Sequence, residues 1–321
     1  MSVPSAASPA GGAAGRPRVR ATRRSHLSQT HREWIAAYLF LLPDVLGLLI
    51  FVALPMVLAL SLGFFNVSGF GTYTFAGLTN YRKMLVDPLF LGSLQVTAKY
   101  VLVLVPGLYV TGLGLALLVK RPVRLIGLFR AMLFLPNVIS LVVIGLLWKF
   151  LFVDRIGMVN VLLSKIGLGG LSWLGDPDLS LWALLGVTIW FLMGFYMLIF
   201  LAGLQEIPRE YYDAARIDGA SAWRSFWDIT LPLLKPTSFF VLLVSLVAAV
   251  AGPQGFDLVY VMTSGGPANS TNLTTYYIFQ QAFLFSNFGY AAAMASFLVC
   301  TLLLLTGILF ALTKGGRFDF D

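Results

Sequence analysis

The sequence predicts an all-α membrane protein with six transmembrane helices and both ends of the chain in the cytoplasm. Hydrophobic residues make up 58% of the 321 residues, charged residues only 11%, and the mean hydropathy is +0.85. Soluble domains carry about 25% charged residues. The apolar residues gather in six stretches, and the basic residues gather in the connections between them. This composition excludes an ordinary soluble enzyme and an intrinsically disordered chain.

Six apolar stretches follow one another along the chain. Each has few charges and is long enough to cross a hydrocarbon core of about 30 Å as a helix. The expected spans are residues 45–65, 100–119, 131–148, 181–204, 237–262 and 288–312. Asp44 then lies near the inner interface, just before the first span.

The basic residues predict the orientation. With the N-terminus in the cytoplasm, 16 of the 22 Lys and Arg residues lie inside, mostly in the tail and in the second-to-third and fourth-to-fifth connections. This is the positive-inside pattern of membrane proteins. The net charge of +8 therefore reports topology, and we expect no nucleic-acid partner.

The chain divides into a tail, a membrane domain and a short end. Residues 1–33 are rich in Ser, Ala, Gly, Pro and Arg, and no signal-peptide core follows at the usual distance, so we expect a disordered basic cytoplasmic tail. Residues 34–316 form the six-helix domain, and residues 317–321 form a cytoplasmic C-terminus.

The residues for catalysis are missing. The only histidines, His26 and His31, lie in the tail, and Cys300 is the only cysteine, so we expect neither a metal site nor a nucleophilic triad. No glycine-rich phosphate loop ending in Gly-Lys-Ser/Thr occurs. We therefore expect that this chain is not an enzyme and binds no cofactor itself.

The connection between the fourth and fifth spans predicts a short helix, a glycine turn and a second helical piece. Pro208 suits the first turn of a helix, and Gly219 suits its C-terminal end. One small face recurs at helical spacing: Tyr211, Ala214, Ala215 and Asp218. Such a face could admit a close partner, or could belong to an ordinary amphipathic connector.

This connection resembles the signature of permease subunits of ATP-binding-cassette importers. That signature reads E-A-A, three residues, G, nine residues, I-x-L-P. The matching positions are Asp213-Ala214-Ala215, Gly219, Ile229 and Leu231-Pro232. Asp213 replaces the glutamate, which keeps the carboxylate and shortens its reach.

Further stretches are similar to sugar permeases of the maltose and glycerol-phosphate type. They comprise residues 256–267 at the end of the fifth span, Gly77-Leu78 and Asn80-Tyr81 in the first outer loop, and residues 136–160. The resemblance covers about residues 36–318 and implies the type I importer permease fold in a bacterial plasma (inner) membrane. It implies transport of a sugar or oligosaccharide. A glycerol phosphate or polyol importer and a secondary transporter remain alternatives.

The resemblance also implies partners. These are a second permease subunit in a heterodimer, two cytoplasmic ATPase subunits that bind ATP and Mg, an extracytoplasmic solute-binding protein, and membrane lipid. The coupling helix, at about residues 206–222, would dock on an ATPase. Its coupling residues would be Asp213, Ala214, Ala215, Asp218 and Gly219.

The resemblance places the substrate path on the fourth and fifth spans. Tyr196 matches a sugar-contacting tyrosine, Gly194 lies close to a matched glycine, and Asn137 is a weaker candidate. Gly252-Pro253-Gln254-Gly255 should break the fifth helix and free backbone carbonyls. The alternative for the glycines is close helix packing.

Overall fold

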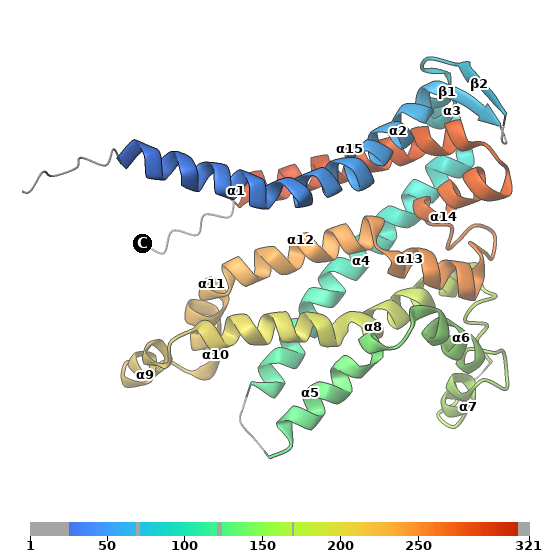
Figure 1. Ribbon diagram of the computed structural model, residues 1–321. Helices are drawn as coiled ribbons and strands as arrows, with labels where there is room; N and C mark the ends of the chain where they lie inside the picture. The colour runs from blue at the N-terminus through green and yellow to red at the C-terminus, as the bar shows by residue number, and fades with distance from the viewer. Residues whose placement is uncertain (1–25, 69–70, 121–123, 169, 314–321) are drawn as a thin grey trace, which may run out of the picture. The chain divides into compact units, whose positions relative to one another are not determined.

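The computed structural model describes residues 26–68, 71–120, 124–168 and 170–313. Two units divide the chain, Met1–Met56 and Val57–Asp321, and each is described by itself. Both are mainly helical (Figure 1). The expected short C-terminus at residues 317–321 and most of the expected tail, residues 1–25, lie outside the described residues.

The described part of the first unit is a long helix. It runs through α1 (His26–Leu48) and a π-helical turn at Leu49–Ala53 into the start of α2 (Leu54–Ser61), whose later residues belong to the second unit. Its apolar side chains are exposed, Phe40 at 88% and Phe51 at 80%, as expected of a helix that faces lipid or another subunit.

The start of this helix corrects two expectations. Residues 26–33 are helical and not part of a disordered tail, because they contain no glycine or proline and continue directly into the apolar helix. The apolar span runs from Ala36 to Phe64, so it begins nine residues earlier than position 45. Asp44 therefore lies inside the helix and not just before its start.

The second unit holds the remaining elements. The chain passes from a 3-10 turn at Leu62–Phe64 into a hairpin and then into a bundle of helices. The larger helices are α3 (Thr79–Val86), α4 (Pro88–Val119), α5 (Ile126–Phe134), α6 (Leu141–Leu151), α7 (Met158–Ser164), α8 (Pro177–Glu206), α9 (Arg209–Ile217), α12 (Lys235–Ala251) and α15 (Phe288–Leu312). The short helical pieces are α10 (Ala222–Ser225), α11 (Leu231–Leu233), α13 (Pro253–Leu258), α14 (Thr274–Phe279), the 3-10 turn Leu135–Val138 and three π-helical turns at Phe226–Thr230, Val259–Thr263 and Gln280–Leu284.

The two longest helices, α4 and α8, start with the same signal. In each, an aspartate caps the N-terminus and a proline follows: Asp87 accepts the amide of Leu89, and Asp176 accepts that of Asp178. This cap starts α4 twelve residues earlier than the expected position 100. Hydropathy alone does not include residues 88–99 in the expected span, because polar residues are frequent among them.

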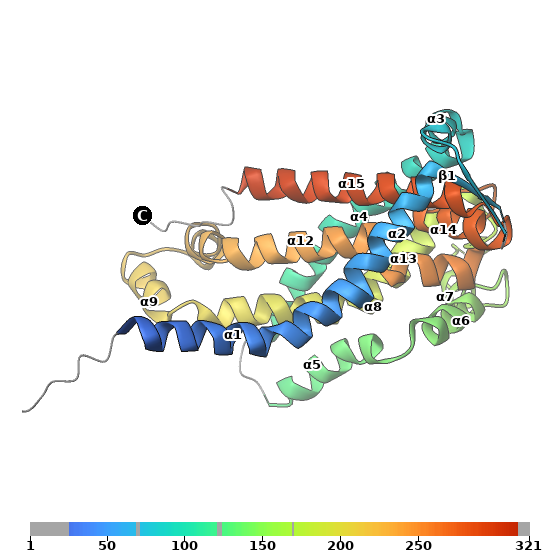
Figure 2. The same cartoon turned by 45° about the horizontal axis from the view of Figure 1, so that its top comes forward.

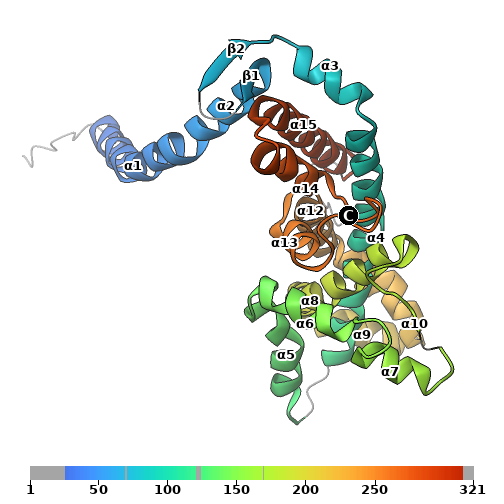
Figure 3. The ribbon, with the colours of Figure 1, turned by 90° about the vertical axis from the view of Figure 1, so that its right-hand side faces the viewer.

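The core lies where α4, α8 and α12 pack together (Figure 3). Leu108 of α4, Phe200 of α8 and Val241 of α12 are fully buried there. In lipid, apolar helices associate through van der Waals contact and not through exclusion of water, so small residues favour association because they let the helix backbones approach closely. A Cβ added to Gly112 of α4 would lie 2.9 Å from the Cβ of Tyr196, which shows how closely α4 and α8 approach. α15 runs beside α12 (Figure 2).

Two of the expected spans are bent. The pair Ile126–Val138 and Leu141–Leu151 bends by 96° where Ile139 and Ser140 are extended, so residues 131–148 are not one straight helix. The expected fifth span, residues 237–262, is α12 followed by α13 and a π-helical turn, and α12 itself follows a 67° bend. Among the described residues, four helices are long and apolar enough to cross a membrane alone, and the bent pairs raise this to at most six.

A two-stranded hairpin departs from the all-α expectation. Strands β1 (Phe65–Ser68) and β2 (Thr72–Phe75) pair antiparallel, with Phe65 opposite Phe75. The buried Asn80 donates to the carbonyls of Gly63 and Phe65, at 3.1 and 3.0 Å, and so ties the hairpin to α3. Outside the spans, alternating aromatic and polar residues favour strands more than helices.

Candidate functional site

The segment between α8 and α12 forms the predicted helix–turn–helix. Pro208 precedes α9, which ends at Ile217, and Gly219 has a left-handed φ of +75°. The amide of Gly219 donates to the carbonyl of Arg216, and that of Ala220 to the carbonyl of Ala215, at 3.1 and 2.8 Å. This is a Schellman ending, which requires the positive φ that glycine adopts most easily. The prediction that Gly219 ends the helix is confirmed.

One tyrosine, Tyr212, holds α9 against the bundle. The Tyr212 hydroxyl is 2.9 Å from the Thr230 hydroxyl, and the Lys120 ammonium lies 4.6 Å above the Tyr212 ring. Tyr212 therefore links α9 to the π-helical turn Phe226–Thr230 and to the end of α4. Ile207, just before α9, is also buried. These contacts make α9 a rigid insert and not a loose connector.

The opposite face of α9 is open. Tyr211, Ala214 and Asp218 are exposed, and Ala215 is half-buried. The predicted small face is therefore accessible to a partner. Sequence reasoning missed the apolar side chains beside it, Ile217 at 87% exposure and Trp223 at 70%. The sequence did carry a signal for them, because both are apolar residues outside the small face predicted for this helix.

The carboxylate at the first signature position pairs within α9. The Asp213 carboxylate lies 3.5 Å from the Arg216 guanidinium, one turn away, and both side chains are mostly exposed. Such an exposed pair contributes about 0–1 kcal/mol. The pair therefore leaves Asp213 available for another cation.

The expected substrate-path residues on α8 are buried in the bundle. Tyr196 is 1% exposed and packs against Gly112. A Cβ on Gly194 would collide with the Leu133 carbonyl and lie 2.8 Å from the Cα of Phe134. Gly194 therefore allows the backbones of α8 and α5 to touch, which is the packing alternative for this residue. Asn137, in the neighbouring 3-10 turn, is half-buried.

The helix break expected at Gly252 is confirmed. α12 ends at Ala251, Gly252 is extended with φ −72° and ψ 153°, and α13 begins at Pro253. The Gln254 side-chain oxygen is buried and has no hydrogen-bond partner in the described structure. Gly255 is buried against Leu273 and Tyr100. A buried acceptor without a partner costs about 1–3 kcal/mol, so a donor is missing here.

A polar cluster lies at the other end of the bundle, where sequence reasoning named no site. Asp87 accepts hydrogen bonds from the hydroxyls of Tyr277 and Tyr290, at 2.8 and 2.6 Å. Gln281 donates to the Tyr277 hydroxyl at 3.0 Å, and the Lys83 ammonium lies 4.4 Å above the Tyr290 ring. The cluster joins the start of α4 to α14 and α15. The Asp-Pro cap was its only signal in the sequence.

These hydrogen bonds shift the ionisation of Asp87. Burial alone would raise the pKa of its carboxyl, but hydrogen bonds from the Tyr290 and Tyr277 hydroxyls and from two backbone amides outweigh burial and lower the pKa below the usual 3.8. Burial and the neighbouring Asp87 charge raise the pKa of Tyr277. A lowered carboxyl pKa stabilises the folded state above the ordinary pKa, and the contribution disappears as the pH falls through the folded pKa.

We therefore expect Asp87→Asn to lower the free energy of unfolding by about 1–2 kcal/mol at pH 7, since a hydrogen bond to a charged acceptor contributes about 1.5–3 kcal/mol and Asp87 is only half-buried. Thermal unfolding of the purified protein in detergent measures this. The difference from wild type should stay constant from pH 8 to 5 and shrink below about pH 4. An equal difference at pH 3.5 and pH 7 would contradict the assignment.

Comparisons with known proteins agree with the signature. A family model described as the binding-protein-dependent transport system inner membrane component matches residues 109–315. A probable ABC transporter permease of Pyrococcus horikoshii is 37% identical over 266 residues, covering 81% of this chain and 89% of the relative. The sulfoquinovosyl glycerol transport system permease of Agrobacterium fabrum is 36% identical, covering 81% and 84%.

A solved structure shares the fold. The chain is similar to one chain of a bacterial alginate ABC transporter, crystallised in complex with an alginate pentasaccharide-bound periplasmic protein. The TM-score is 0.77 with 23% identity, and the match covers 90% of this chain and 97% of the other. Sequence signature, family model and fold agree, and the chain belongs to the family of binding-protein-dependent transport system inner membrane components, the permeases of ABC importers.

Proposed function

We propose that this permease forms, with a second permease subunit, the membrane path of a carbohydrate importer. Two cytoplasmic ATPase subunits would bind ATP and Mg and drive it, and an extracytoplasmic solute-binding protein would deliver the sugar. The chain would lie in the plasma membrane, with α9 and both termini on the cytoplasmic side. Basic residues gather at the α9 end of the bundle, which supports this orientation: Arg209 and Arg216 on α9, Arg224 on α10, and Lys120 over the Tyr212 ring.

The observation that carries the proposal is the exposed, rigidly held α9. Its small face is open, Ile217 and Trp223 are exposed beside it, and Tyr212 and the Gly219 turn hold the backbone. An apolar surface of this kind at the end of a bundle is typical of a protein–protein contact. Movement of the ATPase subunits would push α9 as a unit and bias the bundle between two states.

The substrate class comes from the relatives and from the helix break. One relative is named for sulfoquinovosyl glycerol, and the structural neighbour is an alginate transporter in complex with a periplasmic protein that holds an alginate pentasaccharide. In this chain, Gln254 offers a buried acceptor at the break between α12 and α13. A sugar hydroxyl would donate to this acceptor, and the Tyr196 hydroxyl would offer a second hydrogen bond, since the Tyr196 ring itself packs on Gly112.

Uptake into liposomes tests the function. The chain is reconstituted with its second permease, its ATPase and its binding protein, and labelled sugars or glycerol 3-phosphate are offered with and without ATP. We expect uptake of a sugar that requires both ATP and the binding protein. Uptake of glycerol phosphate alone would favour the polyol-phosphate alternative. Uptake without the ATPase would show a secondary transporter and contradict the proposal.

The substrate path has its own test. Gln254→Ala and Tyr196→Phe should each leave assembly intact and either raise the transport KM or lower the transport rate about tenfold, which is about 1.4 kcal/mol. Tyr196→Phe keeps the ring that packs on Gly112 and removes only the hydroxyl. Wild-type uptake in both variants would place the path elsewhere. Leu204→Met, a buried change near the α9 end, is the control for general repacking.

A further inference from the structure

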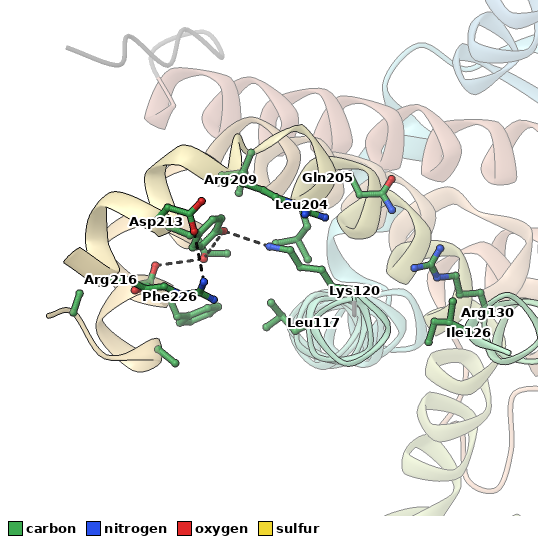
Figure 4. Close-up of a pocket in the computed structure, with 16 residues that line it drawn as sticks. Leu117, Lys120, Ile126, Arg130, Leu204, Gln205, Arg209, Asp213, Arg216 and Phe226 are labelled. Carbon is green, nitrogen blue, oxygen red and sulfur yellow. Dashed lines mark hydrogen bonds and ion pairs between the residues drawn. The ribbon is translucent and has the colours of Figure 1, made fainter. Parts of the chain in front are cut away.

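A charged pocket lies between α9 and the ends of the membrane-crossing helices. Its volume is about 1090 Å³, and its walls come from the ends of α4 and α8, the start of α5 and the segment from α9 to Thr230 (Figure 4). Of the residues that the structure describes, four cationic side chains line it against one acidic side chain, Asp213. The cations are Lys120, Arg130, Arg209 and Arg216. The local excess of positive charge calls for an anionic occupant.

Little of this charge is neutralised within the protein. Arg216 pairs with Asp213 at 3.5 Å. Lys120 lies over the Tyr212 ring, with its ammonium 3.5 Å from the Tyr212 hydroxyl, and no described carboxylate lies within ion-pair distance of it. Arg130 donates one N–H to the Val119 carbonyl at 2.8 Å, which holds its guanidinium at the end of α4 and leaves its positive charge without a described counter-ion.

The remaining walls are apolar. Leu117 of α4, Ile126 of α5 and Leu204 of α8 line the same pocket as the cations. All three lie at the ends of helices or helix pairs that qualify as membrane spans, which is the depth of lipid headgroups. A free phosphate or nucleotide would need the cations but not these walls. A glycerophospholipid uses both, with its phosphate on the cations and its upper chain on the leucines.

We propose that this pocket binds the phosphate headgroup of an anionic glycerophospholipid from the leaflet at the α9 end. Lys120 and Arg209 are the phosphate ligands open to substitution, and Arg130 adds positive charge to the pocket wall. The bound lipid bridges α9 to α4 and α5, so its occupancy adjusts how firmly α9 is held. This inference needs only the position of the pocket at a membrane surface, and it does not depend on the transported substrate.

Native mass spectrometry of the purified full chain tests the site, with dioleoylphosphatidylglycerol and dioleoylphosphatidylcholine as probes. Wild type should bind phosphatidylglycerol at least tenfold more tightly than phosphatidylcholine. In Lys120→Gln/Arg209→Gln, phosphatidylglycerol affinity should fall about 30-fold, or about 2 kcal/mol, with phosphatidylcholine binding unchanged. The matched control is Arg82→Gln/Lys165→Gln, which removes two exposed charges from α3 and the residue after α7. It should bind like wild type.

Two further arms complete the test. Arg209→Gln alone removes an exposed side chain and serves if the double variant does not fold; it should weaken phosphatidylglycerol binding about fivefold. Inorganic phosphate and glycerol 3-phosphate distinguish a lipid site from a free-phosphate site, and neither should displace the lipid at millimolar concentration. Equal loss in the control variant, unchanged affinity in the pocket variants, or displacement by free phosphate would each overturn the proposal.

Discussion

Ala214→Trp and Gly219→Pro are each expected to reduce substrate-stimulated ATP hydrolysis by the assembled transporter more than 100-fold, without loss of membrane insertion. Ala214 lies on the exposed face of α9, where an indole would hold a docking partner away. Gly219 has φ +75°, and proline fixes φ near −65°, so the Schellman ending would be lost. ATPase activity of the complex in nanodiscs, with binding protein and sugar, measures both effects.

Matched controls separate docking from folding. Gly219→Asn should keep most of the activity, because asparagine tolerates the left-handed conformation and a Cβ at Gly219 meets no other atom within 4 Å. Ala214→Ser should behave like wild type, because it adds only one atom to an open face. Wild-type stimulation in both Ala214→Trp and Gly219→Pro would remove α9 from the coupling path.

The second large effect concerns the core. Gly194→Leu is expected to lower the yield of folded, monodisperse protein at least tenfold. The new side chain would meet backbone atoms of Leu133 and Phe134, which cannot rotate away as a side chain can. Overpacking of a core typically costs about 1–3 kcal/mol, and collision with backbone exceeds this range. Size-exclusion chromatography of the chain purified in detergent provides the measurement.

Gly186→Leu is the control on the same helix, because a Cβ at Gly186 meets no atom within 4 Å and the residue is exposed. It should give the yield of wild type. A normal yield of Gly194→Leu combined with impaired sugar uptake would instead return Gly194 to the substrate path.

The local chemistry of α9 and of the helix break was predictable. A proline just before a helix and a glycine just after it are common at helix ends, because their preferred φ values suit those positions. A Gly-Pro pair such as Gly252-Pro253 favours a helix break, because proline lacks the N–H that the helix needs. The sixth span was predicted at Phe288–Leu312, as observed, because both ends coincide with polar residues. Short-range rules suffice in such places.

Other features depend on contacts between distant segments. The 96° bend at Ile139 and Ser140 escapes an average of hydropathy over the span, although Pro136, Asn137 and Ser140 interrupt the apolar run there. The Asp87 cluster joins residues about 200 positions apart in the sequence, and hydropathy values carry no information on which hydroxyl groups become hydrogen-bond partners. The burial of Tyr196 follows from Gly112 on another helix. Sequence periodicity places residues on faces, but only packing decides what those faces meet.

The most direct test of the central claim is a cross-link between α9 and the ATPase subunit. Cys300 is exposed, so Ala214→Cys is made in a Cys300→Ser background. Single cysteines are placed in the cleft of the co-expressed ATPase. We predict a disulfide between Ala214→Cys and the ATPase that forms in membranes and changes in yield when ATP is added, and none from Lys165→Cys beyond the end of α7. Cross-linking from Lys165→Cys and not from Ala214→Cys would contradict the account.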